Sequence, residues 1–207
     1  DLFPRELAAQ YQADDRRVLE SGQVFETTEV NVTPDGEKHW VHVIKSPVLN
    51  AQGEAIGLQG IFWDVTAQTR AEELLGHERD LLRALLDSAP DSIYFKDRDS
   101  RILRASRALA EKLDHDDPKE LEGHTDRDFF APEHAEVALA DEQRVIATGV
   151  PLLGYSEKET HPDGRVTWAL TSKLPLRNAA GGIIGTFGIS KDITELKLAP
   201  APRGRRG

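Results

Sequence analysis

Two stretches of this chain repeat one another, and this internal repeat limits the possible folds more than any other feature. The stretch from 34 to 66 recurs 128 positions later, where a Pro-Asp-Gly turn, a tryptophan, several glycines and a closing Asp-x-Thr keep their spacing. The clearest pairs are Pro34 and Pro162, Asp35 and Asp163, Gly36 and Gly164, Trp40 and Trp168, Lys45 and Lys173, Gly60 and Gly188, Asp64 and Asp192, and Thr66 and Thr194. Upstream, Asp14, Arg17 and Val18 recur 127 positions later. A repeat of this length predicts two copies of one domain.

The two copies differ in completeness. Residues 91–127 precede the repeat in the second copy and have no counterpart before Asp1, so we expect a first copy truncated at its N-terminus and a chain that is a fragment of a longer protein. The predicted divisions are a partial first domain over 1–66, a linker helix over 67–88, a complete second domain over 89–194 and a tail over 195–207. The tail is rich in Pro, Gly and Arg, which predicts disorder.

Hydrophobic periodicity and turn residues predict the same elements in both copies. In the first copy they predict a helix over 4–21 and strands over 25–33, 38–47 and 56–64. In the second copy they predict strands over 92–96 and 101–105, short helices near 106–113 and 118–122, a helix over 132–148, and strands over about 152–160, 166–176 and 183–191. Strands, helices and then three antiparallel strands predict an α+β domain built on a single sheet.

The linker carries apolar residues at helical spacing. Leu74 with Leu81, and Leu75 with Leu82, also have heptad spacing, so a homodimer that pairs through this helix is one prediction. A helix from 67 to 88 spans about 30 Å at roughly 1.5 Å per residue, which is enough for a rigid connection between domains. Thr66 precedes the helix and is predicted to accept a hydrogen bond from its first turn.

Composition excludes several classes of function. The net charge of -10 repels phosphate backbones, so we do not expect nucleic acid as a partner. The chain has no cysteine, which excludes disulfides, thiolate metal sites and a cysteine nucleophile. No apolar run is long enough to cross a bilayer. No nucleophile and base can be assembled from the sequence, so we expect the fragment itself not to be an enzyme.

Several ordered motifs resemble the PAS and PAC sensory modules of bacterial signalling proteins, as in sensor histidine kinases. In the second copy these motifs are Ala89-Pro90-Asp91-Ser92-Ile93, the segment from Gly123 to Phe130, Pro162-Asp163-Gly164, Trp168, Gly185, Gly188 and Asp192-Ile193-Thr194. The resemblance implies a five-stranded antiparallel sheet that cups a small pocket under flanking helices. It also implies a cytoplasmic module that senses a ligand or relays a signal to an effector domain elsewhere in the parent protein.

The resemblance also bears on cofactors. Flavin photosensors of this fold and the photoactive yellow proteins attach their chromophores through cysteine, so neither chemistry is available to this chain. Haem-binding relatives use a histidine on the long helix, where His134 lies in the first turn; we expect an exposed helix start there and no haem. The cofactor, if there is one, is unknown.

The other histidines predict no chemistry. His77 on the linker helix lacks the proline that follows the phosphoacceptor of histidine kinases, so we expect a solvated helix face. His39 and His42 lie three apart on a strand and therefore point to opposite faces, which rules out a paired metal site.

Strand parity in PAS relatives implies which face of the second copy lines a pocket. The candidate pocket residues are Tyr155, Glu157, Ala169, Thr171, Lys173, Thr186, Gly188 and Ser190. The matching face of the first copy, Val41, Val43, Lys45, Leu58, Gly60 and Phe62, is bulkier and is expected to fill the space. The alternative is that the second copy's candidates face solvent and that Trp168, Leu170, Phe187 and Ile189 form the core. Lys173 and Glu157 are predicted either to form a structural ion pair or to hold a charged ligand.

The two Asp-x-Thr motifs close the last strand of each copy. Asp64, Thr66, Asp192 and Thr194 are therefore the candidate signal-relay residues. Two hypotheses remain open. The first is a ligand-sensing tandem segment of a histidine kinase or of a cyclic-dinucleotide enzyme. The second is a ligand-free module for dimerisation and signal relay.

Overall fold

The computed structural model describes residues 5–32 and 36–199, which form two compact units. The first unit is Asp1–Arg79 and the second is Asp80–Gly207. The boundary falls within α2 (Thr66–Ser88), the helix predicted for the linker. Each unit is described by itself below. No helix of the described residues is long and apolar enough to cross a membrane.

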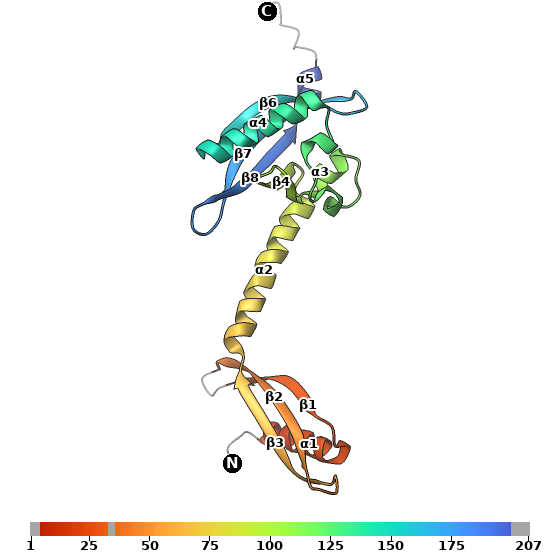
Figure 1. Cartoon of the computed structure of the whole chain (residues 1–207), viewed down its shortest axis with the longest axis vertical. Coiled ribbons are helices and arrows are strands. Elements are labelled where there is room, and N and C mark those ends of the chain that lie inside the picture. The colour runs from red at the N-terminus through yellow and green to blue at the C-terminus, as the bar shows by residue number, and fades with distance from the viewer. Residues whose placement is uncertain (1–4, 33–35, 200–207) are drawn as a thin grey trace, which may run out of the picture. The chain divides into compact units, whose positions relative to one another are not determined.

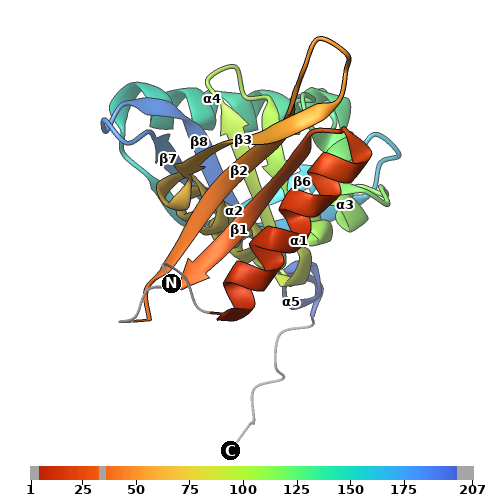
Figure 2. The ribbon, with the colours of Figure 1, turned by 90° about the horizontal axis from the view of Figure 1, so that it is seen from below.

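The first unit is a helix packed on a three-stranded antiparallel sheet. Its elements are α1 (Arg5–Ser21), β1 (Phe25–Val32), β2 (Lys38–Leu49) and β3 (Ala55–Asp64). The strand order is β1-β2-β3, and α1 contacts β2 and β3 (Figure 2). These elements confirm the predicted ones, with β2 two residues longer than expected. Pro34 and Asp35 of the predicted turn lie outside the described residues.

The second unit contains a five-stranded sheet. Its elements are β4 (Ser92–Asp97), β5 (Ile102–Ala105), α3 (Arg107–Lys112), η1 (Pro118–Leu121), η2 (Asp126–Asp128), α4 (Pro132–Thr148), β6 (Leu152–Thr160), β7 (Val166–Arg177), β8 (Ile183–Asp192) and α5 (Thr194–Leu198). The strand order is β5-β4-β8-β7-β6, with every neighbouring pair antiparallel. Helix α4 lies across one face of this sheet (Figure 1) and contacts β6, β7 and β8. The α+β architecture with a single antiparallel sheet is confirmed.

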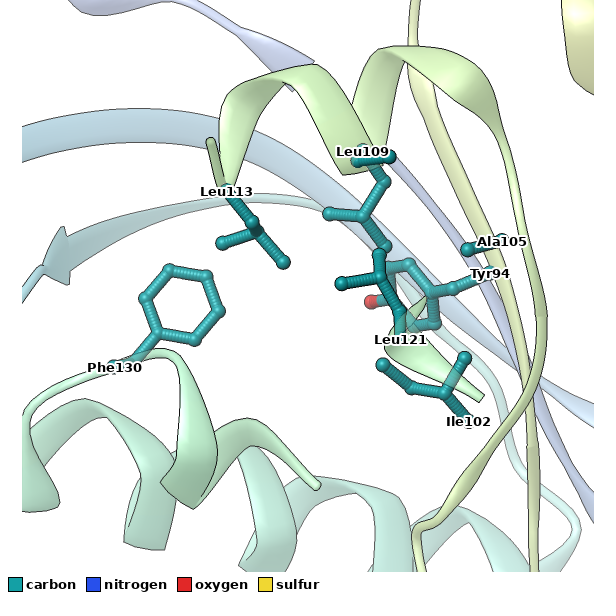
Figure 3. Close-up of a cluster of buried hydrophobic side chains, with 8 residues drawn as sticks. Tyr94, Ile102, Ala105, Leu109, Leu113, Leu121 and Phe130 are labelled. Carbon is teal, nitrogen blue, oxygen red and sulfur yellow. The ribbon is translucent and has the colours of Figure 1, made fainter. Parts of the chain in front are cut away.

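An apolar cluster closes one side of this unit. Side chains from β4, β5, α3, η1 and the segment before α4 point toward one another (Figure 3). The cluster consists of Tyr94, Ile102, Ala105, Leu109, Ala110, Leu113, Leu121 and Phe130. Removing these side chains from water is the main force that holds α3 and η1 against β4 and β5.

The structure departs from the predicted elements in three short segments. The helix predicted near 118–122 is a 3₁₀-helix that starts at Pro118 and is capped by Asp117. The three-residue η2 was not predicted, because so short a segment has no periodicity. The tail predicted to be disordered from 195 is helical as far as Leu198, which corrects that prediction. Residues 200–207 lie outside the described part.

The repeat is confirmed at the level of strand register. Val43 pairs with Phe62 across β2 and β3, and the equivalent residues Thr171 and Ser190 pair across β7 and β8. The helices before these sheets also correspond, since α1 and α4 have the same length and each is followed by a glycine with positive φ. The two sequences therefore build the same helix and three strands.

The second unit adds β4 beside its last strand, whereas β3 is an edge strand in the described part of the first unit. Phe62 is consequently 74% exposed. This corrects the prediction that Phe62 fills a pocket, although Val43 and Lys45 on the same face are buried.

Candidate functional site

The face of β7 and β8 under α4 is buried, as strand parity predicted. Five of its members are at most 5% exposed, and Gly188 is buried with them: Ala169, Thr171, Lys173, Thr186 and Ser190. The alternative core on the opposite face is wrong, because Leu170 is 40% and Ile189 is 41% exposed. The polar face of this sheet is therefore the inner one.

A small cavity lies between this face and the helices. Its volume, taken as the space open to the centre of a water molecule, is about 30 Å³, so it has room for at least one water molecule. Twelve residues from both sheet and helices line it: Ser92, Tyr94, Leu109, Lys112, Asp126, Phe130, His134, Ala138, Glu157, Glu159, Lys173 and Ser190. Most of its lining side chains offer hydrogen bonds.

Glu157 is held by hydroxyl groups. Thr171 donates to its Oε1 at 2.6 Å, and Tyr155 donates to its Oε2 at 3.3 Å. The Ser190 hydroxyl lies 2.9 Å from that of Thr171 and extends this network. Burial raises the pKa of Tyr155 well above its ordinary value, and the nearby carboxylates of Glu157 and Asp141 raise it further. Tyr155 and Thr171 are therefore hydrogen-bond donors that fix the Glu157 carboxylate.

Lys173 is a buried cation whose ammonium group forms a long hydrogen bond. It is 2% exposed, and its ammonium donates to the carbonyl oxygen of Ala138 at 3.4 Å. It forms no ion pair with any residue of the described part, so the predicted pair with Glu157 is wrong. In the first unit, Lys45 donates to Asp15 at 2.7 Å and to the carbonyl oxygen of Tyr11 at 3.4 Å.

A second buried lysine, Lys96, was missed by sequence reasoning. Its ammonium lies 2.6 Å from Asp126 and 2.7 Å from Glu142. Burial alone would lower the pKa of Lys96, but the two carboxylates raise it. Burial would likewise raise the pKa of Asp126, but the charge and hydrogen bond of Lys96 keep it below its ordinary value. Glu142 lies at helical spacing from the buried Ala135, Ala138 and Val145, which was a readable sign that it points inward.

Three of the predicted pocket residues, Gly188, Thr186 and Ala169, are buried, and there is no free space beside Gly188. A Cβ atom added to Gly188 would lie 2.3 Å from the ring of Tyr94, so that ring occupies the room beside the glycine. The Thr186 hydroxyl oxygen is buried and has no hydrogen-bond partner within the described ranges. Ala169 is fully buried and pairs with Glu157 across β6 and β7.

The helical side of the cavity is also charged and partly aromatic. Lys112 on α3 donates to Glu159 on β6 at 2.7 Å. His134 is buried against Phe130, with 4.6 Å between the ring centroids, and its Nδ1 lies 3.2 Å from the carbonyl oxygen of Lys158. The prediction of an exposed histidine at this helix start is therefore wrong.

At the end of the first sheet, Asp64 and Thr66 form a fixed junction. The Asp64 carboxylate accepts the backbone amide of Thr66 at 2.7 Å, and the Thr66 hydroxyl oxygen accepts the backbone amide of Trp40 at 2.8 Å. The prediction that Thr66 caps the helix is corrected, because its side chain binds the strand. Hydrogen bonds from the side chain and amide of Thr66 lower the pKa of Asp64.

The second sheet ends in the same junction. Asp192 accepts the backbone amide of Thr194 at 2.7 Å, and the Thr194 hydroxyl oxygen accepts the amide of Trp168 at 2.9 Å. Burial would raise the pKa of Asp192, but hydrogen bonds from Thr194 lower it. Each Asp-x-Thr thus joins the middle strand of the repeated sheet to the first residue of a helix.

Three other histidines, His39, His42 and His77, lie on the faces predicted for them. His39 lies near Asp64, and His42 lies near Glu26, on opposite faces of β2. His77 is exposed on α2. No group of three or more acidic or histidine side chains that could hold a metal occurs within the described ranges.

Three comparisons describe what this chain is similar to. A family model described as PAS fold matches residues 1–70 and 86–198. The methanogenesis regulatory histidine kinase FilI of Methanothrix harundinacea is 29% identical over 117 residues, which cover 56% of this chain and 13% of that protein. A diguanylate cyclase of Vibrio cholerae is 30% identical over 129 residues, which cover 61% of this chain and 40% of that protein.

One solved structure is similar to part of this chain. A crystal structure of a PAS domain from Colwellia psychrerythraea matches with a TM-score of 0.48 and 17% identity, over 56% of this chain and 97% of that one. The chain spans less than half the length of the curated relatives that it matches.

Proposed function

The chain belongs to the PAS fold family, whose domains are sensory and non-catalytic modules, and from this premise we propose that its second unit binds a small molecule. The proposal includes a relay, in which each Asp-x-Thr junction passes a change in its sheet to the helix that follows. The ligand therefore acts on the sheet of the second unit, and α5 carries the response of that sheet, whereas α2 carries a change in the sheet of the first unit.

The observation that carries this proposal is the divergence of the two inner faces. Thr171 and Ser190 in the second unit replace Val43 and Phe62 of the first, at equivalent positions in the register. Buried polar groups are costly unless they form hydrogen bonds. A cavity lined by such groups therefore favours a site for a polar ligand or ordered water over a site that only stabilises the fold.

The relay is supported by where the hydrogen bonds lie. Trp168 and Thr194 connect β7 to α5, and Trp40 and Thr66 connect β2 to α2. A sheet that changes its twist on binding a ligand therefore acts on a helix start, and two signalling states differ by only a few kcal/mol.

The effector is proposed from the relatives. A histidine kinase and a diguanylate cyclase are among the proteins that this chain resembles. We assign the chain to the cytoplasmic sensory part of such a signalling protein, with a histidine kinase as the first choice of effector.

The test compares two preparations of the 207-residue chain by native mass spectrometry and hydrogen exchange. One preparation is purified under native conditions, and the other is denatured, dialysed and refolded to remove any bound molecule. We expect a defined extra mass on the first preparation alone, together with slower exchange in β8 and α4. Equal masses and equal exchange in the two preparations would contradict ligand binding.

A second candidate function, ligand-free dimerisation, is favoured by the exposed leucines of α2. Leu74 is 67%, Leu75 is 71% and Leu81 is 54% exposed. Such side chains at heptad spacing suit pairing with a second copy of the same helix. Light scattering of the native chain and of a Leu74→Glu/Leu81→Glu variant decides the matter, with Glu72→Gln as the matched exposed control. A dimer that only the leucine changes dissociate would support this candidate, and a monomeric native chain would exclude it.

A further inference from the structure

We propose that Lys173 anchors a small neutral ligand of the amide type, one that offers an acceptor oxygen to the lysine and an N–H donor to acceptor groups on the neighbouring strands that line the cavity. This inference rests on the proposed function and names the chemistry of its ligand. The two repeats provide the same lysine, Lys45 and Lys173, in two different surroundings.

Lys173 and Lys45 occupy equivalent positions in the two repeats. Both ammonium groups reach a backbone carbonyl of the packed helix at 3.4 Å. Lys45 also has a carboxylate, Asp15, at 2.7 Å. The residue equivalent to Asp15 in the second unit is Glu142, so a carboxylate is present on the correct turn of the helix. Lys173 nevertheless lacks an ion pair with the residues that the structure describes.

Lys173 lacks this partner because Glu142 binds another lysine. Glu142 is 1% exposed, and its Oε1 lies 2.7 Å from Lys96, which belongs to β4. Its other oxygen, Oε2, is buried and has no hydrogen-bond partner in the described part. Glu142, the equivalent of the Asp15 that binds Lys45, therefore binds Lys96 instead of Lys173. An ammonium group has three N–H donors, and a single bond of 3.4 Å leaves most of that capacity unused.

The charge balance of the site favours a neutral ligand over an anionic one. The cavity and its buried ion pairs contain three positive charges, on Lys96, Lys112 and Lys173, and four negative ones, on Asp126, Glu142, Glu157 and Glu159. The charge of Lys173 also lowers the pKa of Asp126, so its charge is balanced at longer range. What the ammonium lacks is a second acceptor in addition to the Ala138 carbonyl oxygen at 3.4 Å. An anionic ligand would add a negative charge beside Asp126 and Glu157 in a site of low dielectric, where such repulsion is strong.

The cavity also offers acceptors to the donor side of the ligand. The cavity is lined by Ser92, Ser190 and the Glu157 carboxylate. Serine hydroxyls can accept hydrogen bonds, and an ionised carboxylate can only accept them. A ligand with both a carbonyl oxygen and an N–H matches Lys173 with its oxygen and these acceptors with its N–H. Because the cavity has a volume of about 30 Å³, the smallest amides are the suitable probes.

The experiment uses three probes of nearly equal shape and different charge: acetamide, acetate and acetamidinium. Each is titrated to about 100 mM into the whole isotope-labelled chain at constant ionic strength, because ligands of four heavy atoms bind weakly. Backbone amide shifts in two-dimensional NMR spectra are the readout. We expect acetamide to shift the amides of Ser92 and Ser190 saturably, with an affinity about tenfold above those of the two ions.

Two matched variants test the role of the lysine. Lys173→Met should weaken acetamide binding about tenfold, whereas Lys45→Met should leave it unchanged. If Lys173→Met fails to fold, the order of affinities in the wild-type chain still decides. Acetate as the tightest probe would overturn the neutral assignment, and equal losses in both variants would overturn the role of Lys173.

The outcomes separate this inference from the proposed function. A retained small molecule in native mass spectrometry, with no acetamide binding, would refute the amide chemistry and leave ligand sensing intact. No retained molecule and no binding of any probe would refute both.

Discussion

The backbone amide of Trp40 donates to the hydroxyl oxygen of Thr66 at 2.8 Å, which fastens the first residue of α2 to the middle strand of its sheet. The next residue of the junction supports the same connection, since the amide of Val65 donates to the carbonyl oxygen of Trp40, also at 2.8 Å. The helix start and the strand therefore move together.

We predict that Thr66→Ala destabilises the first unit by about 1–2 kcal/mol, because it leaves the Trp40 amide without its acceptor. Thr66 is buried, so water does not replace the lost hydroxyl readily. Native-state hydrogen exchange should show faster exchange of the Trp40 amide. Thr66→Ser keeps the hydroxyl and is the control. Equal exchange at Trp40 in both variants would show that this hydrogen bond does not hold the junction.

Gly188→Ala should destabilise the second unit by about 2 kcal/mol or more, because the new Cβ atom would lie 2.3 Å from the Tyr94 ring and overpacking strains a core. Gly60 is its repeat partner and has no atom within 4 Å of an added Cβ. Gly60→Ala should therefore change stability by at most about 0.5 kcal/mol. Urea unfolding followed by exchange mass spectrometry reports on each unit separately. Equal costs at the two glycines would contradict this explanation.

Glu142→Gln should cost about 3 kcal/mol of unfolding free energy in the second unit, since it removes one partner of a buried ion pair. Lys96 keeps Asp126 in this variant, which sets the loss at the low end of such changes. Glu136→Gln, on the exposed face of α4, is the control and should be nearly neutral. A neutral Glu142→Gln would mean that the Lys96 and Glu142 pair contributes little to stability.

His161 should make the second unit less stable in mild acid. Burial lowers the pKa of His161, and the charge of Arg165 lowers it further. A histidine with a depressed pKa favours folding fully above its unfolded pKa of about 6.5, and this stability is lost as the pH falls below that value. The unfolding free energy should thus drop between about pH 7.5 and 5.5. His161→Gln should flatten the drop, and His77→Gln should not. A drop of the same size in His161→Gln would assign it to other groups.

Much of the fold follows from local patterns. The turn at Pro162-Asp163-Gly164 was predictable because glycine readily adopts a positive φ. Gly164 has a φ of 85°. The helix over 132–148 was predictable to the residue, since it starts at a proline and stops before Gly149. Alternation placed Thr171 and Ser190 on one face of the sheet, and the resemblance to PAS relatives indicated that this face is the inner one.

The pairing of charges was not predictable in this way. Glu142 could be placed on the buried side of its helix, but two lysines from different strands compete for it, and only tertiary distances decide between them. Strand alternation also placed Lys173 and Glu157 on one face and suggested a pair. The hydroxyls of Thr171 and Tyr155 occupy the carboxylate instead, and no local pattern describes that choice.

The identical junctions at Thr66 and Thr194 affect how chains of this kind evolve. A gene duplication that copies a sheet together with its Asp-x-Thr also copies the fastening of the next helix, so each new domain arrives with a working connection. The two copies here have kept that connection while their inner faces have diverged, with Val43 and Phe62 in one and Thr171 and Ser190 in the other. If the second unit binds a ligand as proposed, new ligand preferences can thus arise by substitutions on one sheet face, with no change to the junction that we propose as the relay.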